Sequence, residues 1–293
     1  MRVNFAVSFK KIIIMSKLIS LLYVLFAAAS GMAQIVIMSP EDFKKGDSCG
    51  VASYIVYYDM AYVEDTLNHP DKAVHETMCL ETGGGISSFY SYEEFLADSA
   101  NAAVFANGGT SFSGGKNVHW QLYVNYPVAG KTALLEKFGL DRFVCTEDYA
   151  APAWTPVADS SAVIFGYPCR MAVAAYKGRT WYAWYAEDIP VGVGPWKLGG
   201  LPGLILQAYD SRRHYVFRAT GMAQAAPGRP MYYKGSKYEA VSRKELEDIR
   251  RRYHADPDGY LTADSKATVR HFDKFGNELG ASGSEPYNPI ELQ

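Results

Sequence analysis

Short runs of β-branched and aromatic residues, separated by Gly, Asn or Asp, occupy most of this 293-residue chain. In VASYIVYYDMAYVED (51–65), Ile55, Tyr57 and Val63 fall on one side of a period-two pattern, and AVHETMCLE (73–81) follows a turn as its hairpin partner. Alternation over short runs predicts half-buried strands. Because the connections are short, antiparallel hairpins are favoured over crossover helices. Further strands are expected at 117–126, 141–148, 161–178, 179–188, 204–210 and 214–221.

Two helices are predicted from their N-terminal signals. Segments 91–105 and 242–254 each begin with Ser followed three residues later by Glu, which is a capping box. In the second segment Leu246 and Ile249 recur at helical spacing among charged residues. A third, shorter helix is predicted over 131–139. We therefore expect an α+β fold with a large, twisted, mainly antiparallel β-sheet, for which a half-barrel is one form, and two or three packed helices.

The N-terminal segment 1–33 has the order of residues typical of a secretory signal peptide. Met15 is the expected true start, and a Lys, an apolar core at 21–29 and small residues ending at Ala33 follow it. No Cys follows the small residues, so a lipoprotein is not expected. A membrane anchor is the alternative, but the apolar run is shorter than the roughly 20 residues that a span needs. We expect an exported protein that is periplasmic or associated with the outer membrane.

Residues 34–293 are expected to form a single β-rich domain. Removal of the signal segment leaves 25 basic and 31 acidic residues, a net charge of −6. A negative balance of this size disfavours a nucleic-acid partner, because DNA and RNA backbones are themselves anionic.

All four cysteines lie in this domain, which predicts two disulfides in an oxidising compartment. Four cysteines allow three pairings, and the pairs closest in sequence, Cys49–Cys79 and Cys145–Cys169, are the ones predicted. Metal ligation by the four is disfavoured, because no two of them are close in sequence as structural zinc sites require.

None of the candidate catalytic motifs has all the residues that its chemistry requires. Gly130-Lys131-Thr132 has the layout of a phosphate-binding loop, but Asn125 stands where the first Gly is needed and Pro127 removes a backbone amide. The glycine-flanked serines around 111 lack the second Gly of a nucleophile elbow, and the six His form no local metal pattern. We therefore predict a protein without catalytic residues, metal, cofactor or nucleotide. A site assembled from distant residues stays an open alternative.

The most distinctive stretch is GPWKLGGLPGLIL (194–206), which contains the sequence GLPGLI. It resembles the motif that names the GLPGLI family, and segments 166–198, 87–99 and 287–292 are also similar to that family. The resemblance covers most of residues 75–293. It implies an exported envelope protein of Bacteroides-type Gram-negative bacteria, in a family without an agreed biochemical activity.

The physical chemistry of this stretch predicts a stiff loop. Pro202 fixes its own φ and Gly203 can adopt a positive φ, so the pair fits the centre of a type II turn. The apolar run 204–206 then predicts a central strand covered on both faces. The loop is interpreted as a packed corner, as the mouth of an apolar groove, or as an oxyanion-binding turn, and no nucleophile accompanies the last of these.

Ligand contacts are predicted beside this loop. In GRTWYAWY, Trp184 and Trp181 point to opposite faces of one strand, so one face belongs to the core and the other is covered by a helix or by a ligand. Arg179 is expected to anchor a phosphate or carboxylate, or to form a surface salt bridge. The predicted binding residues are Arg179, Trp181, Trp184, Trp196, Leu201, Pro202, Gly203 and Leu204.

Together these features favour a non-catalytic envelope protein that binds an apolar or amphipathic ligand, lipid-like or peptide, or an envelope partner protein. The alternatives are an envelope hydrolase with an unrecognised site and a structural partner of an outer-membrane receptor. A cavity without convergent titratable groups would favour binding, whereas a Ser–His pair or paired carboxylates in a cleft would favour the enzyme. A flat exposed apolar patch would favour the structural partner.

Overall fold

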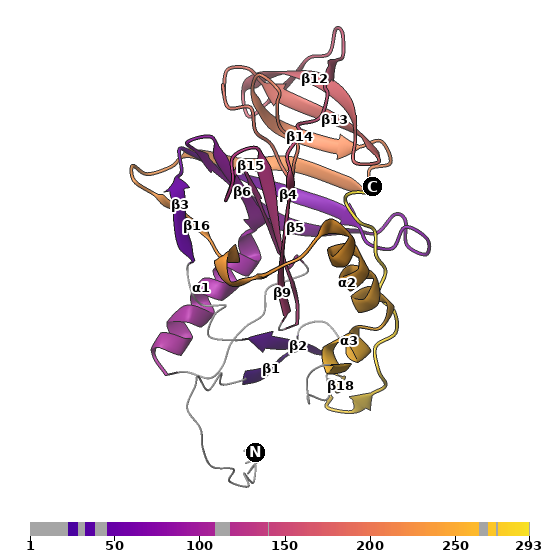
Figure 1. Cartoon of the computed structure of the whole chain (residues 1–293). Helices are drawn as coiled ribbons and strands as arrows, with labels where there is room; N and C mark the ends of the chain where they lie inside the picture. The colour runs from indigo at the N-terminus through magenta and orange to yellow at the C-terminus, as the bar shows by residue number, and fades with distance from the viewer. Residues whose placement is uncertain are drawn as a thin grey trace.

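The computed structural model describes residues 46–108, 118–139, 141–263, 269–273 and 275–292, and the backbone of 23–28 and 33–38. Its main element is a sheet of 13 strands that is not closed into a barrel. Three helices accompany the sheet in the described residues, so the predicted α+β class is confirmed. Figure 1 shows the strand direction changing along the sheet, from β12–β14 at the top to β9, which runs nearly vertically.

The strands follow one another in the sheet mostly in an order set by hairpins. Every neighbouring pair is antiparallel except β17 and β9, which are parallel. From one edge to the other the order is β10 (Thr155–Pro156), β12 (Tyr167–Tyr176), β13 (Arg179–Ala186), β14 (Leu204–Asp210), β15 (Tyr215–Gln224), β4 (Tyr54–Val63), β5 (Ala73–Gly83), β6 (Ile86–Ser91), β7 (Trp120–Val124), β8 (Lys131–Phe138), β9 (Asp141–Asp148) and β17 (Glu239–Ala240), with β11 (Ala162–Ile164) paired to β12.

The predicted hairpin of 51–65 with 73–81 is confirmed, because β4 and β5 pair over ten residues from Tyr54↔Thr82 to Val63↔Ala73. The expected two-sided burial of 204–206 is also confirmed, since all three side chains are buried. The largest core cluster collects residues from both halves of the sheet, among them Tyr58, Phe89, Leu122, Trp181 and Phe217.

The two predicted capped helices are present and cover the sheet. Helix α1 (Tyr92–Ala106) begins after Ser91, whose hydroxyl accepts a hydrogen bond from the Glu94 amide, and packs on β5 and β6. Helix α2 (Arg243–Ala255) has a complete capping box at Ser242 and packs on β9. A further short helix, α3 (Pro257–Ala263), follows α2 and packs against it.

Smaller two-stranded sheets surround the main one. β16 (Pro230–Tyr233) pairs with β3 (Asp47–Val51) and precedes the 3₁₀ turn η2 (Gly235–Lys237), while β18 (His271–Phe272) pairs with β19 (Glu278–Leu279). β1 (Tyr23–Ala28) pairs with β2 (Ala33–Met38). Met15 and most of the predicted signal segment 1–33 lie outside the described residues, so the signal peptide stays a prediction.

The helix predicted over 131–139 is wrong, because this segment forms strand β8. β8 is an interior strand between β7 and β9, and Leu134 and Leu135 are buried on opposite faces of it in two different core clusters. Two-sided burial removes the period-two alternation, and a short apolar run then reads equally well as a helix.

The predicted disulfides are absent: all four cysteines are free, buried thiols. Cys49 lies on β3, whereas Cys79 lies on the central strand β5 in another packing cluster with Tyr90. Cys145 on β9 and Cys169 on β12 belong to strands near opposite ends of the sheet order. The cysteine pairs that are closest in sequence are therefore not bonded in the fold.

Candidate functional site

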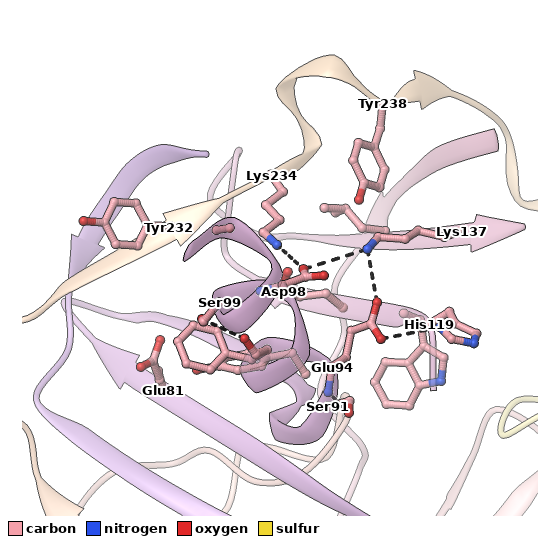
Figure 2. Close-up of a pocket in the computed structure, with 16 residues that line it drawn as sticks. Glu81, Ser91, Glu94, Asp98, Ser99, His119, Lys137, Tyr232, Lys234 and Tyr238 are labelled. Atoms are coloured by element: carbon pink, nitrogen blue, oxygen red, sulfur yellow. Dashed lines mark hydrogen bonds and ion pairs between the residues drawn. The ribbon is translucent and has the colours of Figure 1, made fainter. Parts of the chain in front are cut away.

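A cavity of about 480 Å³ lies between helix α1 and the sheet. Its lining combines aromatic and aliphatic side chains with charged and amide side chains (Figure 2). The lining comes from β5, β6, α1, the residues around the start of β7, β8, β16 and the segment that follows it; its apolar members are Tyr90, Phe95, Ala102, Trp120, Leu135, Tyr232 and Tyr238.

The local sequence explains how α1 supplies the charged wall. Glu94 and Asp98 are four residues apart, so they project from the same face of the helix. The Ser91 cap fixes where the helix starts and hence the direction of this face. Figure 2 shows both carboxylates turned toward Lys137 of β8 and Lys234, the residue after β16.

These groups form a chain of alternating charges along one wall of the cavity, which we call the charge chain: Lys234, Asp98, Lys137, Glu94 and His119. Lys234 Nζ lies 2.6 Å from Asp98 Oδ2, and Lys137 Nζ lies 4.0 Å from that oxygen and 3.3 Å from Glu94 Oε1. His119 Nδ1 lies 3.8 Å from Glu94 Oε2 and ends the chain. Each carboxylate of the chain thus has at least one oppositely charged neighbour.

Electrostatics keep Glu94 ionised. Burial acts to raise the pKa of this carboxyl, but hydrogen bonds and charge attraction from His119 and Lys137 outweigh it and lower the pKa to about 2. Another carboxylate of the lining, Glu81, receives Arg229 Nε at 3.1 Å and Nη2 at 2.7 Å. The carboxylates of the cavity lining therefore have oppositely charged partners within the protein itself.

Of the residues predicted to bind, Arg179 is a buried structural clamp in this structure, not a surface salt bridge. Its guanidinium pairs with Asp210 at 2.9 Å, and both side chains are 2% exposed. The remaining donors bind the C-terminal segment, at Asn288 Oδ1, the Pro289 carbonyl and the Ile290 carbonyl. The expectation that Arg179 makes an exposed ion pair is thus wrong.

The two tryptophans of GRTWYAWY point to opposite faces of β13, as predicted. Trp181 is buried in the core and stacks on Phe217, whereas Trp184 is half-buried on the other face. The helices pack mainly on β5, β6 and β9, and Figure 1 places β12–β14 at the end of the molecule away from α1 and α2. The predicted helix lid over this strand is therefore not observed.

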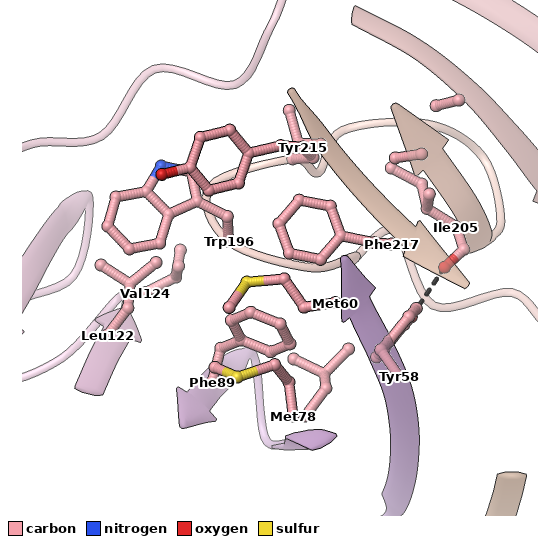
Figure 3. Packing of buried hydrophobic residues seen from close by; sticks show 14 of the residues in the cluster. Tyr58, Met60, Met78, Phe89, Leu122, Val124, Trp196, Ile205, Tyr215 and Phe217 are labelled. Carbon is pink, nitrogen blue, oxygen red and sulfur yellow. Dashed lines mark hydrogen bonds between the residues drawn. The ribbon is translucent and has the colours of Figure 1, made fainter. Parts of the chain in front are cut away.

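Trp196 lies in the core cluster that Figure 3 shows with Leu122 and Phe217. It has a positive φ of 56°, makes an edge contact with Trp120, and donates from Nε1 to Glu291 Oε1 at 3.0 Å. Next to it, Lys197 Nζ lies 2.8 Å from the same carboxylate oxygen. The loop is thus tied to the C-terminus of the chain.

This loop is joined to two further elements by a network of buried and partly buried charges. Lys197 Nζ also lies 3.0 Å from Glu147 Oε2 on β9. Arg243 at the start of α2 lies 2.6 Å from Glu291 Oε2 and 3.4 Å from Glu147. Lys197 and Glu291 have side chains only 2% and 3% exposed, so their charges are compensated mainly by one another and by Glu147 and Arg243.

The type II turn predicted at Pro202–Gly203 is absent. The positive φ in this part of the loop belongs to Gly200, at 86°, and not to Gly203. Gly203 is required for a different reason: a Cβ atom there would overlap the carbonyl of Ala186 on the neighbouring strand. Leu201 and Leu204 are buried and Pro202 is exposed.

The structure thus brings Trp196, Leu201, Gly203 and Leu204 together as a packed corner, while none of the eight predicted binding residues is among those that line the cavity. Their assignment as ligand contacts stays a prediction. The charge chain was missed because its members come from distant segments. The one local signal was the i, i+4 pair of acids on α1, beside the apolar Phe95 and Leu96.

A further sequence pattern concerns catalysis. Residues 46–50, GDSCG, match G-x-S-x-G, which in hydrolases places Ser on a sharp strand-to-helix turn. Here Ser48 is exposed on strand β3 opposite Tyr232, and β3 does not lead into a helix. The nucleophile-elbow geometry is therefore missing.

Within the described ranges, no group of three or more His, Cys, Asp or Glu side chains is placed to hold a metal ion. None of the helices among the described residues has the length and apolar character to cross a membrane.

Comparison with known proteins gives limited matches. A family model described as "Protein of unknown function (Porph_ging)", a Bacteroidetes-type family, matches residues 170–207, which include β13 and the loop around Trp196. No curated protein sequence matches. The solved structures that match include two crystal forms of PNGF-II, in space groups P21 and C2, at 16% and 15% identity with TM-scores of 0.45 and 0.47. They cover 68% and 70% of this chain, which spans about a third of theirs, 33% and 34%.

Proposed function

We propose that this chain is an exported envelope protein of the GLPGLI type that binds an amphipathic ligand in the cavity between α1 and the sheet. The motif at 200–205 and the signal-like segment 1–33 support export and family. The family-model match at 170–207 overlaps the same motif.

The observation that carries the proposal is the composition of the cavity wall. A space of about 480 Å³ is within the range of small-molecule sites, and its lining combines aromatic rings with a few ordered polar groups. The aromatic part offers apolar surface for burial of a hydrocarbon or ring. The charge chain offers fixed donors and acceptors in the same lining.

Binding is favoured over hydrolysis by the state of the carboxylates. A general acid needs a raised pKa and a general base one near the working pH. The pKa of Glu94 is lowered to about 2, against the opposing effect of burial, by His119 and Lys137, so this group is a poor acid and a weak base at neutral pH. The other acidic residue of α1 in the wall, Asp98, is held 2.6 Å from Lys234.

The test uses the neutral fluorescent probe N-phenyl-1-naphthylamine, whose emission rises on transfer to an apolar site. Purified wild-type protein should bind it with a saturable signal. Ala102→Trp, which fills the cavity, should weaken binding at least tenfold, whereas Ala100→Trp on the exposed side of α1 should not. Ser99→Trp is a second blocking variant, and circular dichroism and Tm verify that each variant is folded.

Two results would contradict the proposal. The first is no saturable probe signal from folded wild-type protein. The second is equal binding by the blocking variants and the Ala100→Trp control. Native mass spectrometry of protein purified from its own host is the complementary measurement, because it detects a co-purifying amphiphile directly.

A further inference from the structure

The charge chain constrains which head group the cavity accepts, given that the proposed function is right. Each ionised side chain in the lining already has an oppositely charged partner inside the protein: Asp98 with Lys234, Glu94 with Lys137, and Glu81 with Arg229. The side chains of Asp98 and Lys137 are 10% and 19% exposed, so water screens them only in part. The wall is rich in charges but close to neutral as a unit.

A charged head group would have to compete with these internal partners. An anion that draws Lys234 away leaves Asp98 in a partly buried site with only the more distant Lys137, at 4.0 Å. A cation that draws Glu94 away removes the counter-charge that lies 3.3 Å from Lys137. Either exchange costs the desolvation and attraction that the internal pair had satisfied, so a charged ligand gains little net free energy.

An uncharged hydroxyl group has no such competition. A carboxylate oxygen has more than one lone pair and an ammonium has three N–H donors, so both can bind a hydroxyl while keeping their ion pair. Ser99 and Gln121 add neutral polar groups to the same lining. A group with several hydroxyls can therefore donate to Asp98 and Glu94 and accept from the lysines at once.

The aromatic side chains of the lining can contact the apolar surface of a polyhydroxylated group. Trp120, Tyr232 and Tyr238 line the cavity together with the α1 carboxylates and come from β7, β16 and the segment after η2. A ring that carries C–H bonds on its faces and hydroxyls on its rim buries apolar surface against aromatic side chains while its rim stays hydrogen-bonded. We infer that the ligand is an amphiphile with an uncharged, polyhydroxylated, sugar-like head.

The experiment compares four probes by isothermal titration calorimetry on full-length protein, each below its micellar concentration. Octyl β-D-glucoside, octyl sulfate and octyltrimethylammonium share one chain and differ in head group, and methyl β-D-glucoside lacks the chain. We expect octyl glucoside to bind at least tenfold more tightly than each of the other three. Its affinity should change less than twofold between 50 and 500 mM NaCl, because no net charge is transferred.

The outcomes separate the two proposals. If none of the three octyl probes binds, the proposed function fails and the inference fails with it. If octyl sulfate or octyltrimethylammonium binds as tightly as the glucoside, the cavity binds amphiphiles but the inference is overturned. If methyl glucoside binds as tightly as octyl glucoside, the ligand is a free sugar and the amphipathic part of the proposal is wrong.

A gain-of-binding variant tests the reason behind the preference. Asp98→Asn removes the partner of Lys234 with little change of shape, so octyl sulfate should bind at least tenfold more tightly, and the ratio of the octyl glucoside affinity to the octyl sulfate affinity should fall. Glu94→Gln is the second variant, because it removes the counter-charge that lies 3.3 Å from Lys137. Asp148→Asn, which breaks the Lys131–Asp148 pair outside the cavity lining, is the matched control and should change neither affinity. An unchanged octyl sulfate affinity in both folded variants overturns the inference.

Discussion

The indole of Trp196 donates a hydrogen bond to the carboxylate of Glu291 at 3.0 Å, although 95 residues separate them. Glu291 also forms salt bridges with Lys197 and Arg243, so one carboxylate connects the loop, the C-terminal segment and helix α2. Because the side chain of Glu291 is 3% exposed, water cannot replace it as the counter-charge of these cations.

The first prediction is that Glu291→Gln lowers the free energy of unfolding by about 3 kcal/mol, because it removes the buried one of the two carboxylates that Lys197 and Arg243 share and leaves them Glu147 alone. Urea denaturation measures the effect. The neighbouring Leu292→Ala is the control: its side chain is 49% exposed and its contact to Lys177 is made by the backbone amide, so a loss below about 0.5 kcal/mol is expected. Equal losses in the two variants would contradict the central role of Glu291.

The second prediction concerns close packing at Gly203. Gly203→Ala should lower the free energy of unfolding by about 2–4 kcal/mol, because its Cβ would overlap the Ala186 carbonyl on β13. Gly221→Ala is the matched control, since a Cβ there meets Tyr57 at an ordinary 3.5 Å and the residue is not among those with positive φ. Thermal unfolding distinguishes the two, and a neutral Gly203→Ala would mean that the loop can move away from β13.

The third prediction follows from the free thiols. Burial raises the pKa of all four cysteines, that of Cys79 to about 12, so native protein should react with DTNB at less than one thiol per chain. In 6 M guanidinium four thiols should react, and a reductant should leave Tm unchanged. Zero or two reactive thiols after unfolding under non-reducing conditions would show that disulfides form after all.

Much of the fold follows from the sequence. Strands with one solvated face keep the alternation of polar and apolar residues, and N-cap residues mark where helices begin. The hairpin β4–β5 and the helix starts after Ser91 and Ser242 are of this kind. Segment 131–138 is not, since Leu134 and Leu135 face two different core clusters and the period is lost. The order of β15 next to β4 also has no local signal, because it depends on contacts about 150 residues apart.

The candidate site was less predictable than the fold. Arg179, Trp181 and Trp196 have the residue types that bind ligands in exposed grooves, but the C-terminal segment and the core occupy their polar and apolar surfaces. The cavity instead depends on Lys234 meeting Asp98 across 136 residues. The type of a residue shows whether it can bind a ligand. Only the tertiary contacts show whether other residues of the protein already occupy its polar groups and apolar surface.

The last prediction concerns His254, which lies in the last turn of α2 and stacks on Tyr287 of the C-terminal segment with ring centroids 4.5 Å apart. Burial, and then the charge of Arg250, lower the pKa of His254 from 6.5 to about 4. The unfolded chain therefore binds more protons than the folded one between these values, so stability is present at neutral pH and is lost as pH falls from about 6.5 toward 4. The loss from this group is at most about 3 kcal/mol.

The comparison that isolates this histidine is His254→Phe, which keeps the ring on Tyr287 but cannot titrate. Burial raises the pKa of the nearby Glu285, which adds stability as pH falls and so opposes the effect of His254. Since Glu285 is present in both proteins, the difference in unfolding free energy between wild type and His254→Phe should still change by about 1–3 kcal/mol between pH 7 and pH 4.5. His69→Gln, at an exposed turn, is the control. If the wild-type and His254→Phe curves run parallel, His254 is not neutral in the folded protein and the stack on Tyr287 tolerates its charge.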